Sequence, residues 1–95
     1  MKVSIPLDVV FRDLGGEALI IHMGTGTYFG LDEIGTRIWQ LLAKHGSIET
    51  AVTVLHREYE VDDADLRRDV EGLVRKLAES NLLNMQAAQA PGRAR

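Results

Sequence analysis

Hydrophobic residues in the first third of the chain form three short runs, at positions 9–12, 17–23 and 27–31. Runs of this length that contain β-branched and aromatic residues predict β-strands. The second and third runs are separated by Gly24-Thr25-Gly26, and glycine adopts the positive φ of tight turns at little cost. The pattern therefore predicts an antiparallel hairpin, with the first run as a third strand.

A helical spacing of apolar residues begins after Asp32, which is a preferred helix N-cap residue. Gly46 suits the end of this helix and Ser47 suits the cap of a second one, because glycine adopts a left-handed backbone and serine accepts a hydrogen bond from the first turn. The apolar face of the first helix is predicted to consist of Ile34, Ile38, Leu41 and Leu42, with Trp39 at its border. The second helix is expected to bury Ile48, Ala51, Val52, Leu55 and Tyr59.

A third helix is predicted over residues 64–80, with an apolar side made of Leu66, Val70, Leu73, Val74 and Leu77. Asn81 suits its end, and Leu82 and Leu83 are expected to fold back onto the core. Residues 84–95 contain no aromatic or β-branched residue, which predicts a flexible tail. We therefore expect one α+β domain over residues 1–83, winged helix-turn-helix-like, in which a three-stranded antiparallel sheet is followed by three helices.

The composition limits the classes of function. The chain has no cysteine, which excludes disulfides and zinc–thiolate sites and is typical of a cytoplasmic protein. It has neither a signal-peptide pattern nor an apolar run long enough to cross a membrane. Residues 1–83 carry all 14 acidic residues and nine of the 11 basic ones, a formal charge of −5, which opposes binding to nucleic acid.

No catalytic, cofactor or metal site is expected. The glycines at 24, 26 and 30 do not match a dinucleotide fingerprint, because strand-like residues follow them and Asp32 would repel a phosphate at the helix start. The three histidines lie far apart, and Asp62, Asp63 and Asp65 lack the glycine and distal glutamate of a calcium loop. The chain also has no G-x-S-x-G turn, so an enzyme is not expected.

The winged-helix order of elements makes a DNA-binding transcriptional regulator the alternative function. The third helix would then be the recognition helix, whose first residues meet the bases. Those residues include Asp62, Asp63, Asp65 and Asp69, and their carboxylates would be repelled from a major groove. The basic pairs at 67–68 and 75–76 favour DNA binding, although they are also spaced to pair with Glu71 and Glu79. A scaffold subunit without a peptide groove is a third alternative.

The third strand favours binding of another chain. We expect it at the edge of the sheet, because the following segment leaves as a helix. An edge strand presents unpaired N–H and C=O groups to which a peptide strand can be added, and Gly30 would let another backbone approach closely. On the third helix, Asp69, Leu73 and Lys76 share one flank.

For some residues of this surface, the pattern does not distinguish a role in packing from a role in ligand binding. Packing is the favoured role for Phe29, Val70 and Leu77. For Tyr28, Asp69 and Lys76, both roles stay open.

The ordered set of motifs resembles the family of the pyrroloquinoline-quinone biosynthesis protein D, over residues 9–83. The matching features are the hairpin with G-x-Y-F, Leu31-Asp32, Gly35, Ile38-Trp39, Asp69-Val70 and the terminal Leu82-Leu83. Asp32 stands where the family often has Asn, and either residue caps a helix.

The resemblance implies a recognition element for ribosomally made precursor peptides, in which the leader segment docks as a strand on the third strand, in a groove bordered by the third helix. It implies the peptide-binding residues Tyr28, Phe29, Gly30, Leu31, Leu66, Asp69, Val70, Leu73 and Lys76. The chain is most similar to the discrete leader-binding proteins of lasso-peptide pathways, where a leader peptidase and an ATP-dependent cyclase would be partners. No cofactor is implied, and the exposed edge leaves a homodimer open.

Overall fold

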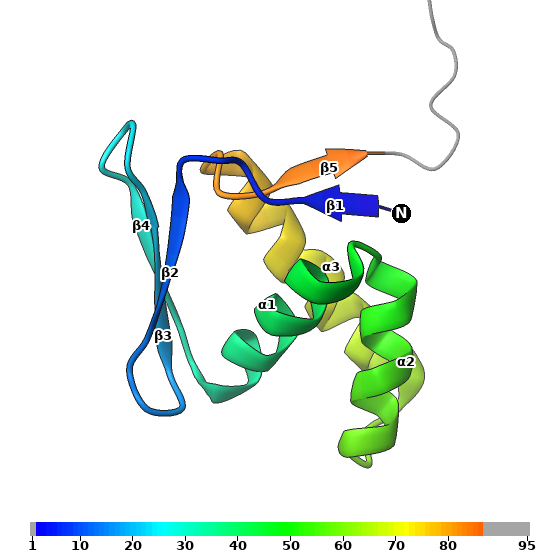
Figure 1. Ribbon diagram of the computed structural model, residues 1–95. Coiled ribbons are helices and arrows are strands. Elements are labelled where there is room, and N and C mark those ends of the chain that lie inside the picture. Colours follow the sequence, from blue (N-terminus) through cyan, green and yellow to red (C-terminus); the bar gives the residue numbers. More distant parts are fainter. Residues whose placement is uncertain (1, 87–95) are drawn as a thin grey trace, which may run out of the picture.

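The computed structural model describes residues 2–86 and places a sheet on one side of three helices (Figure 1). The strands and helices in chain order are β1 Lys2–Ser4, β2 Val9–Asp13, β3 Ala18–His22, β4 Tyr28–Leu31, α1 Glu33–His45, α2 Ile48–Glu58, α3 Asp63–Glu79 and β5 Asn84–Gln86. The α+β class, with the three-stranded antiparallel sheet of β2, β3 and β4 followed by three helices, confirms the fold class predicted from the sequence.

The main sheet has the order β2-β3-β4 and is antiparallel throughout. Ile20 in the central strand lies opposite Phe11 on one side and Phe29 on the other. The β3–β4 loop turns at Gly26, whose φ is +79°, and His22 Nδ1 accepts hydrogen bonds from the backbone N–H groups of Gly24 and Thr25. The predicted hairpin and its glycine turn are therefore confirmed.

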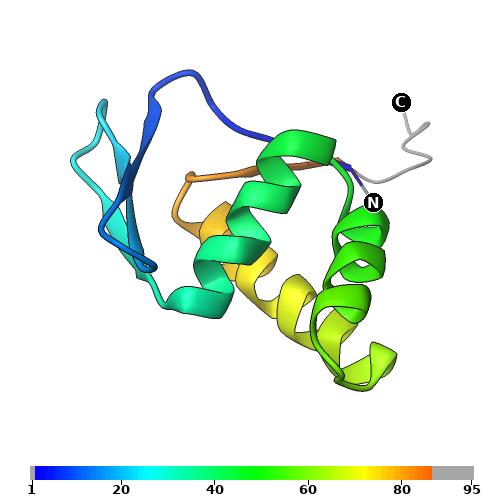
Figure 2. The ribbon, with the colours of Figure 1, turned by 60° about the horizontal axis from the view of Figure 1, so that its bottom comes forward.

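The two faces of this sheet have different surroundings. Ala18, Ile20 and Leu31 are buried on the inner face, where α1 lies, whereas Tyr28 and Gly30 are exposed on the outer face. α1 and α3 lie between the sheet and α2 (Figure 2). The core is thus formed where the inner face of the sheet meets the helices.

The helix boundaries follow the capping residues. Asp32 accepts a hydrogen bond from the N–H of Gly35 at 2.7 Å, and Ser47 accepts one from Thr50 at 3.2 Å. Gly46 ends α1 in the left-handed conformation, with a φ of 66°. These features confirm the predicted start and end of α1 and the predicted start of α2. Tyr59, expected on the buried side of the second helix, instead follows its last residue in an extended conformation and is half-buried.

The apolar face of α1 differs from the prediction at two positions. Ile34 is 50% exposed, whereas Trp39 is 3% exposed and belongs to the core. The reason is the position of the sheet, because Val9 and Phe11 of β2 line the same cleft as Trp39 and so cover that side of α1. Ile34 stands in the first turn of α1 and remains at the surface.

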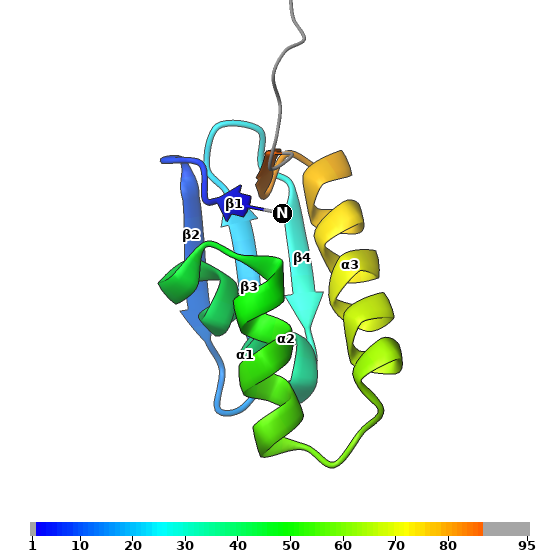
Figure 3. The ribbon, with the colours of Figure 1, turned by 90° about the vertical axis from the view of Figure 1, so that its right-hand side faces the viewer.

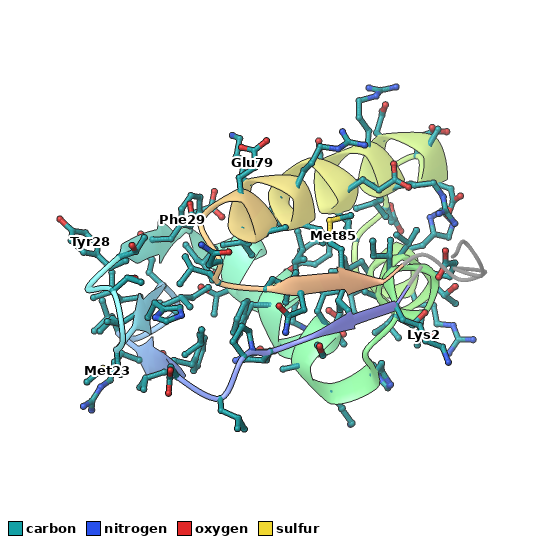
Figure 4. All side chains as sticks on the ribbon, turned by 90° about the horizontal axis from the view of Figure 1, so that it is seen from above. Lys2, Met23, Tyr28, Phe29, Glu79 and Met85 are labelled. Atoms are coloured by element: carbon teal, nitrogen blue, oxygen red, sulfur yellow. The ribbon has the colours of Figure 1, made fainter. Side chains whose placement is uncertain are left out.

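A second, two-stranded sheet joins the two ends of the described chain. β1 and β5 lie side by side (Figure 4) and pair in an antiparallel register that places Val3 opposite Met85. The predicted tail is therefore corrected, since residues 84–86 form a strand, and residues 87–95 lie outside the described part. The turn at Asn81, with a φ of 61°, and the full burial of Leu82 bring the chain back beside β1.

The helices share one core with the main sheet. α2 packs against both α1 and α3, and the side chains of Leu55, Val70, Val74 and Leu77 are completely buried. Leu82 and Leu83 are buried in the same cluster, which confirms their predicted return to the core. Among residues 2–86, no helix is long and apolar enough to span a bilayer.

Candidate peptide-binding edge

β4 is an edge strand of the main sheet, as the sequence predicted. Seen from the side, the elements follow the order β2, β3, β4 and α3, so that α3 runs beyond the open edge of β4 (Figure 3). The edge strand and the third helix therefore border the same part of the surface. This arrangement brings together the two segments that the resemblance named.

The backbone of β4 has two residues whose polar groups point away from the sheet. His22 N donates to Thr27 O at 2.8 Å, which makes these two residues a hydrogen-bonded pair. Because such pairs alternate along an antiparallel ladder, Phe29 and Leu31 also pair with β3. Tyr28 and Gly30 consequently direct their N–H and C=O groups toward the open edge, where they are available to another strand.

The side chains of β4 alternate between the two faces. Tyr28 is 69% exposed and points away from the helices, whereas Leu31 is buried (Figure 4). Phe29 is half-buried and packs against the core. No atom lies within 4 Å of the position that a Cβ at Gly30 would take, so the space in front of this residue is open.

A shallow hollow adjoins Gly30 on the sheet. It has a volume of about 330 Å³ and is lined by Leu14, Leu19, Gly30 and Asp32, among others. Sequence reasoning missed Leu14 and Leu19. The structure places Leu19 opposite Gly30, because His22 pairs with Thr27 and the loop spans residues 23–26. A turn at residues 24–26 alone would have placed Leu19 opposite Leu31.

The helix residues fall into two groups. Leu66 is 6% exposed and Val70 is fully buried, so both belong to the core beneath the surface. Leu73 is half-buried at the margin of the core, and the side chains of Asp69 and Lys76 are exposed. Of the residues expected on α3, Asp69, Leu73 and Lys76 are therefore the ones that a ligand would reach.

The start of α3 is acidic. Asp62 caps the helix by accepting from Ala64 N at 3.1 Å, and Asp63 and Asp65 stand in the first turn. Carboxylates at this position suit the positive end of the helix dipole and repel a phosphate backbone. The hydrogen bond from Ala64 thus identifies Asp62 as the N-cap of α3.

Two arginines of α3 are paired with carboxylates of the chain. Arg67 lies 3.7 Å from Glu71 and Arg68 lies 3.2 Å from Asp65. These ion pairs occupy two arginines that a DNA-binding helix would need for its contacts with DNA. Among residues 2–86, no group of three or more histidine or acidic side chains is placed to hold a metal ion.

Comparison with known proteins identifies a family. The model of a family described as coenzyme PQQ synthesis protein D (PqqD) matches residues 17–83. No match was found among curated proteins.

Two solved structures have the same fold. One, described as TbiB1 in complex with the TbiA(β) leader peptide, is 40% identical, covers 92% of this chain and 99% of its own, and has a TM-score of 0.82. The other, described as lasso peptide synthetase B1 complexed with the leader peptide, is 22% identical, covers 90% of this chain and all of its own, and has a TM-score of 0.79. At that identity the second structure shows the fold alone.

Proposed function

The chain belongs to the family of coenzyme PQQ synthesis protein D, and from this premise we propose that it binds the leader segment of a ribosomally made precursor peptide. The observation that carries the proposal is the 40% identity, over 92% of the chain, with a protein whose structure contains a leader peptide. The open edge of β4 supplies a physical reason, because its free backbone groups can hold an added strand.

The proposed peptide strand pairs its backbone with Tyr28 and Gly30. A peptide residue opposite Gly30 then directs its side chain to the outer face, near the hollow lined by Leu14 and Leu19. The residues before and after it point to the inner side, where Phe29 and Leu73 are half-buried. Backbone pairing would give affinity, and these two apolar surfaces would select side chains.

The charged residues of α3 would add selectivity. Asp69 and Lys76 are exposed on the flank that also carries Leu73. Each would attract a peptide side chain of opposite charge, and pairs at such an exposed position contribute up to about 1 kcal/mol. We propose that Leu66 and Val70 support this flank from the core.

The bound leader would be delivered to processing enzymes of a lasso-peptide pathway, a leader peptidase and a cyclase. Holding the leader in place raises the effective concentration of the attached core peptide at the enzyme that the domain contacts. The role proposed for the chain is binding, and no reaction is assigned to it. Because the precursor is made on ribosomes, the cytoplasm is the proposed location.

A binding titration tests the function. The probe is the fluorescently labelled TbiA(β) leader peptide, and anisotropy is measured as the full chain is added. We expect saturable binding that Leu73→Arg weakens at least about tenfold, because a buried apolar contact is replaced by a charge. Arg75→Glu, an exposed change on the same helix, is the matched control and should bind normally.

A second variant separates binding from folding. Lys76→Glu changes an exposed side chain, so circular dichroism should report an unchanged fold. In the same titration, its affinity for the leader peptide should differ from that of the unchanged chain. No saturable binding by the folded chain, or equal binding by the Leu73→Arg variant, would reject the proposal.

A further inference from the structure

The loop that joins β3 to β4 stands at one end of the main sheet, directly before the open edge of β4 (Figure 1). His22 N donates to Thr27 O and Gly26 N donates to His22 O, each at 2.8 Å, so the loop comprises residues 23–26. The length of this loop sets the register of β4. A shift of one residue would turn the backbone groups of Tyr28 and Gly30 toward β3 and move the side chain of Tyr28 to the inner face.

The side chain of His22 holds this loop. Its Nδ1 accepts hydrogen bonds from Gly24 N at 3.1 Å and from Thr25 N at 3.2 Å. Because backbone N–H groups can only donate, Nδ1 must carry a lone pair, and the ring is neutral with its proton on Nε2. A hydrogen bond of 2.9 Å between the hydroxyl groups of Thr25 and Thr27 continues this network to the residue before β4. The ring of His22 is thus linked to the start of the edge strand.

Gly24 leaves the room that the ring needs. A Cβ at this position would lie 3.0 Å from Cε1 and 3.3 Å from Nδ1 of His22, which is closer than a side-chain carbon normally approaches. Gly24 does not have the positive φ that explains the glycine at position 26. The position of the His22 ring therefore accounts for glycine at position 24.

Protonation of Nδ1 would turn this acceptor into a donor, and both hydrogen bonds to the loop would be lost. Asp8, just before β2, places a carboxylate oxygen 3.5 Å from the Cβ position of Gly24, on the side where the ring lies. This carboxylate would attract a protonated ring without replacing the two bonds. Val9 and Thr27, which lie opposite His22 on its two sides, are uncharged. Among residues 2–86, His22 forms no ion pair.

We infer, on the premise that β4 binds the leader, that His22 is a positioning residue for that edge. Its neutral ring holds the loop in the shape that directs the backbone groups of Tyr28 and Gly30 outward, and protonation of the ring weakens leader binding. His22 acts through the loop, because β4 lies between β3 and the added strand.

A pH series of leader binding tests the inference. Anisotropy of the labelled TbiA(β) leader is measured with the full chain from about pH 8 to about pH 5.5, a range in which imidazole side chains change charge. We expect the dissociation constant to rise about tenfold toward acid, because two hydrogen bonds that hold the loop are lost. Circular dichroism at each pH checks that the chain stays folded.

Two variants assign this pH dependence to His22. Asparagine carries an acceptor oxygen at the same bonding position as Nδ1 of histidine and does not titrate in this range. His22→Asn should therefore bind the leader as the unchanged chain does at pH 8 and keep that affinity in acid, to within about twofold. His22→Ala has no acceptor and should bind about tenfold more weakly at every pH. His45→Asn, the same replacement at an exposed position at the end of α1, is the matched control and should retain the pH dependence.

Nuclear magnetic resonance of the free chain gives a second readout. The amide resonances of Gly24 and Thr25 should shift with the same pH midpoint as the leader affinity. The inference is overturned by amide resonances that do not shift, by an equal pH dependence in His22→Asn, or by weak binding of His22→Asn at pH 8. Leader binding that is saturable at every pH and equally tight would refute the role of His22 alone and leave the proposed function standing. No saturable binding at pH 8 would reject the function itself.

Discussion

At Gly30 the backbone avoids the left-handed region and no atom occupies the place of a side chain, so the isolated fold does not require glycine here. Its neighbour Tyr28 is a large side chain that is 69% exposed on the outer face. A strand added at this edge would pass over the open position and contact the exposed aromatic ring beside it. Individual residues of β4 thus indicate a surface shaped for contact as well as for packing.

The first prediction concerns Gly30. Gly30→Val should fold with equal or slightly higher stability, because a β-branched residue favours a strand and no neighbour must move. It should weaken leader binding about tenfold, since the new side chain occupies the space over which the peptide would lie. Thermal unfolding and anisotropy titration measure the two effects. Equal affinity would show that the peptide does not pass over this residue.

The second prediction concerns Thr36 in α1, whose buried hydroxyl has no hydrogen-bond partner in the described structure. Thr36→Val keeps the branched shape and removes the unpaired polar atom. We expect the free energy of unfolding to rise by about 1 kcal/mol, measured by urea denaturation. The exposed Thr50→Val serves as the control and should change little. A loss of stability in Thr36→Val would contradict the prediction.

At the scale of the elements, an ion pair links α1 to α2. Arg37 Nε donates to Glu58 Oε1 at 2.9 Å, and a second bond joins the same side chains. This hydrogen bonding lowers the pKa of Glu58 and raises the pKa of Arg37. Both side chains are about one-third exposed, so the contribution to stability is modest.

The third prediction follows from that pKa. A carboxyl group whose pKa is lowered by folding stabilises the fold above its unfolded pKa of about 4.3, and the contribution is lost as the pH falls through the lower folded value. Glu58→Gln should therefore reduce the unfolding free energy at neutral pH by about 0.5 kcal/mol and have little effect in strong acid. Urea denaturation across pH measures this. If the free energy of unfolding of Glu58→Gln stays reduced at low pH, the substitution has disturbed packing and not only removed a charge.

The fourth prediction concerns β5, the strand that lies where a tail was expected. A chain ending at residue 83 loses the pairing of β5 with β1, in which Met85 lies opposite Val3. Compared with a chain ending at residue 86, it should be less stable by about 1 kcal/mol in urea denaturation. Equal stability would mean that the small sheet adds nothing to the fold.

Across the whole molecule, the sequence predicted the elements that have strong local signals. Asp32, Gly46 and Ser47 set the helix ends because capping depends on neighbouring residues alone. β1 and β5 were not predicted, since three-residue strands of mixed polarity give little local signal and their pairing depends on the return of the chain at Leu82 and Leu83. Trp39 was placed at the border of its helix because its covering comes from β2, which is distant in sequence.

The candidate site was predictable to a similar depth. Gly30 and the end of the sheet at β4 followed from local pattern and from the order of elements. The spacing along α3 placed Leu73 on a flank and favoured packing for Val70, whereas the extent to which Leu73 is exposed depends on how α3 packs and could not be derived from periodicity. The hollow lined by Leu14 and Leu19 depends on how the turn between β2 and β3 lies beside the end of β4, which no single segment encodes.

The fifth prediction uses the charge of the whole chain, formally −3. A peptide held by backbone hydrogen bonds and apolar contacts releases few counterions, so its affinity should change little from low to high salt, by less than about threefold. Binding to DNA would instead fall steeply, because each neutralised phosphate releases an ion. Anisotropy with the labelled TbiA(β) leader and with a labelled DNA duplex, over one salt series, compares the two. Tight duplex binding that collapses with salt would favour the regulator alternative, whereas salt-tolerant peptide binding with no duplex binding is the expected result.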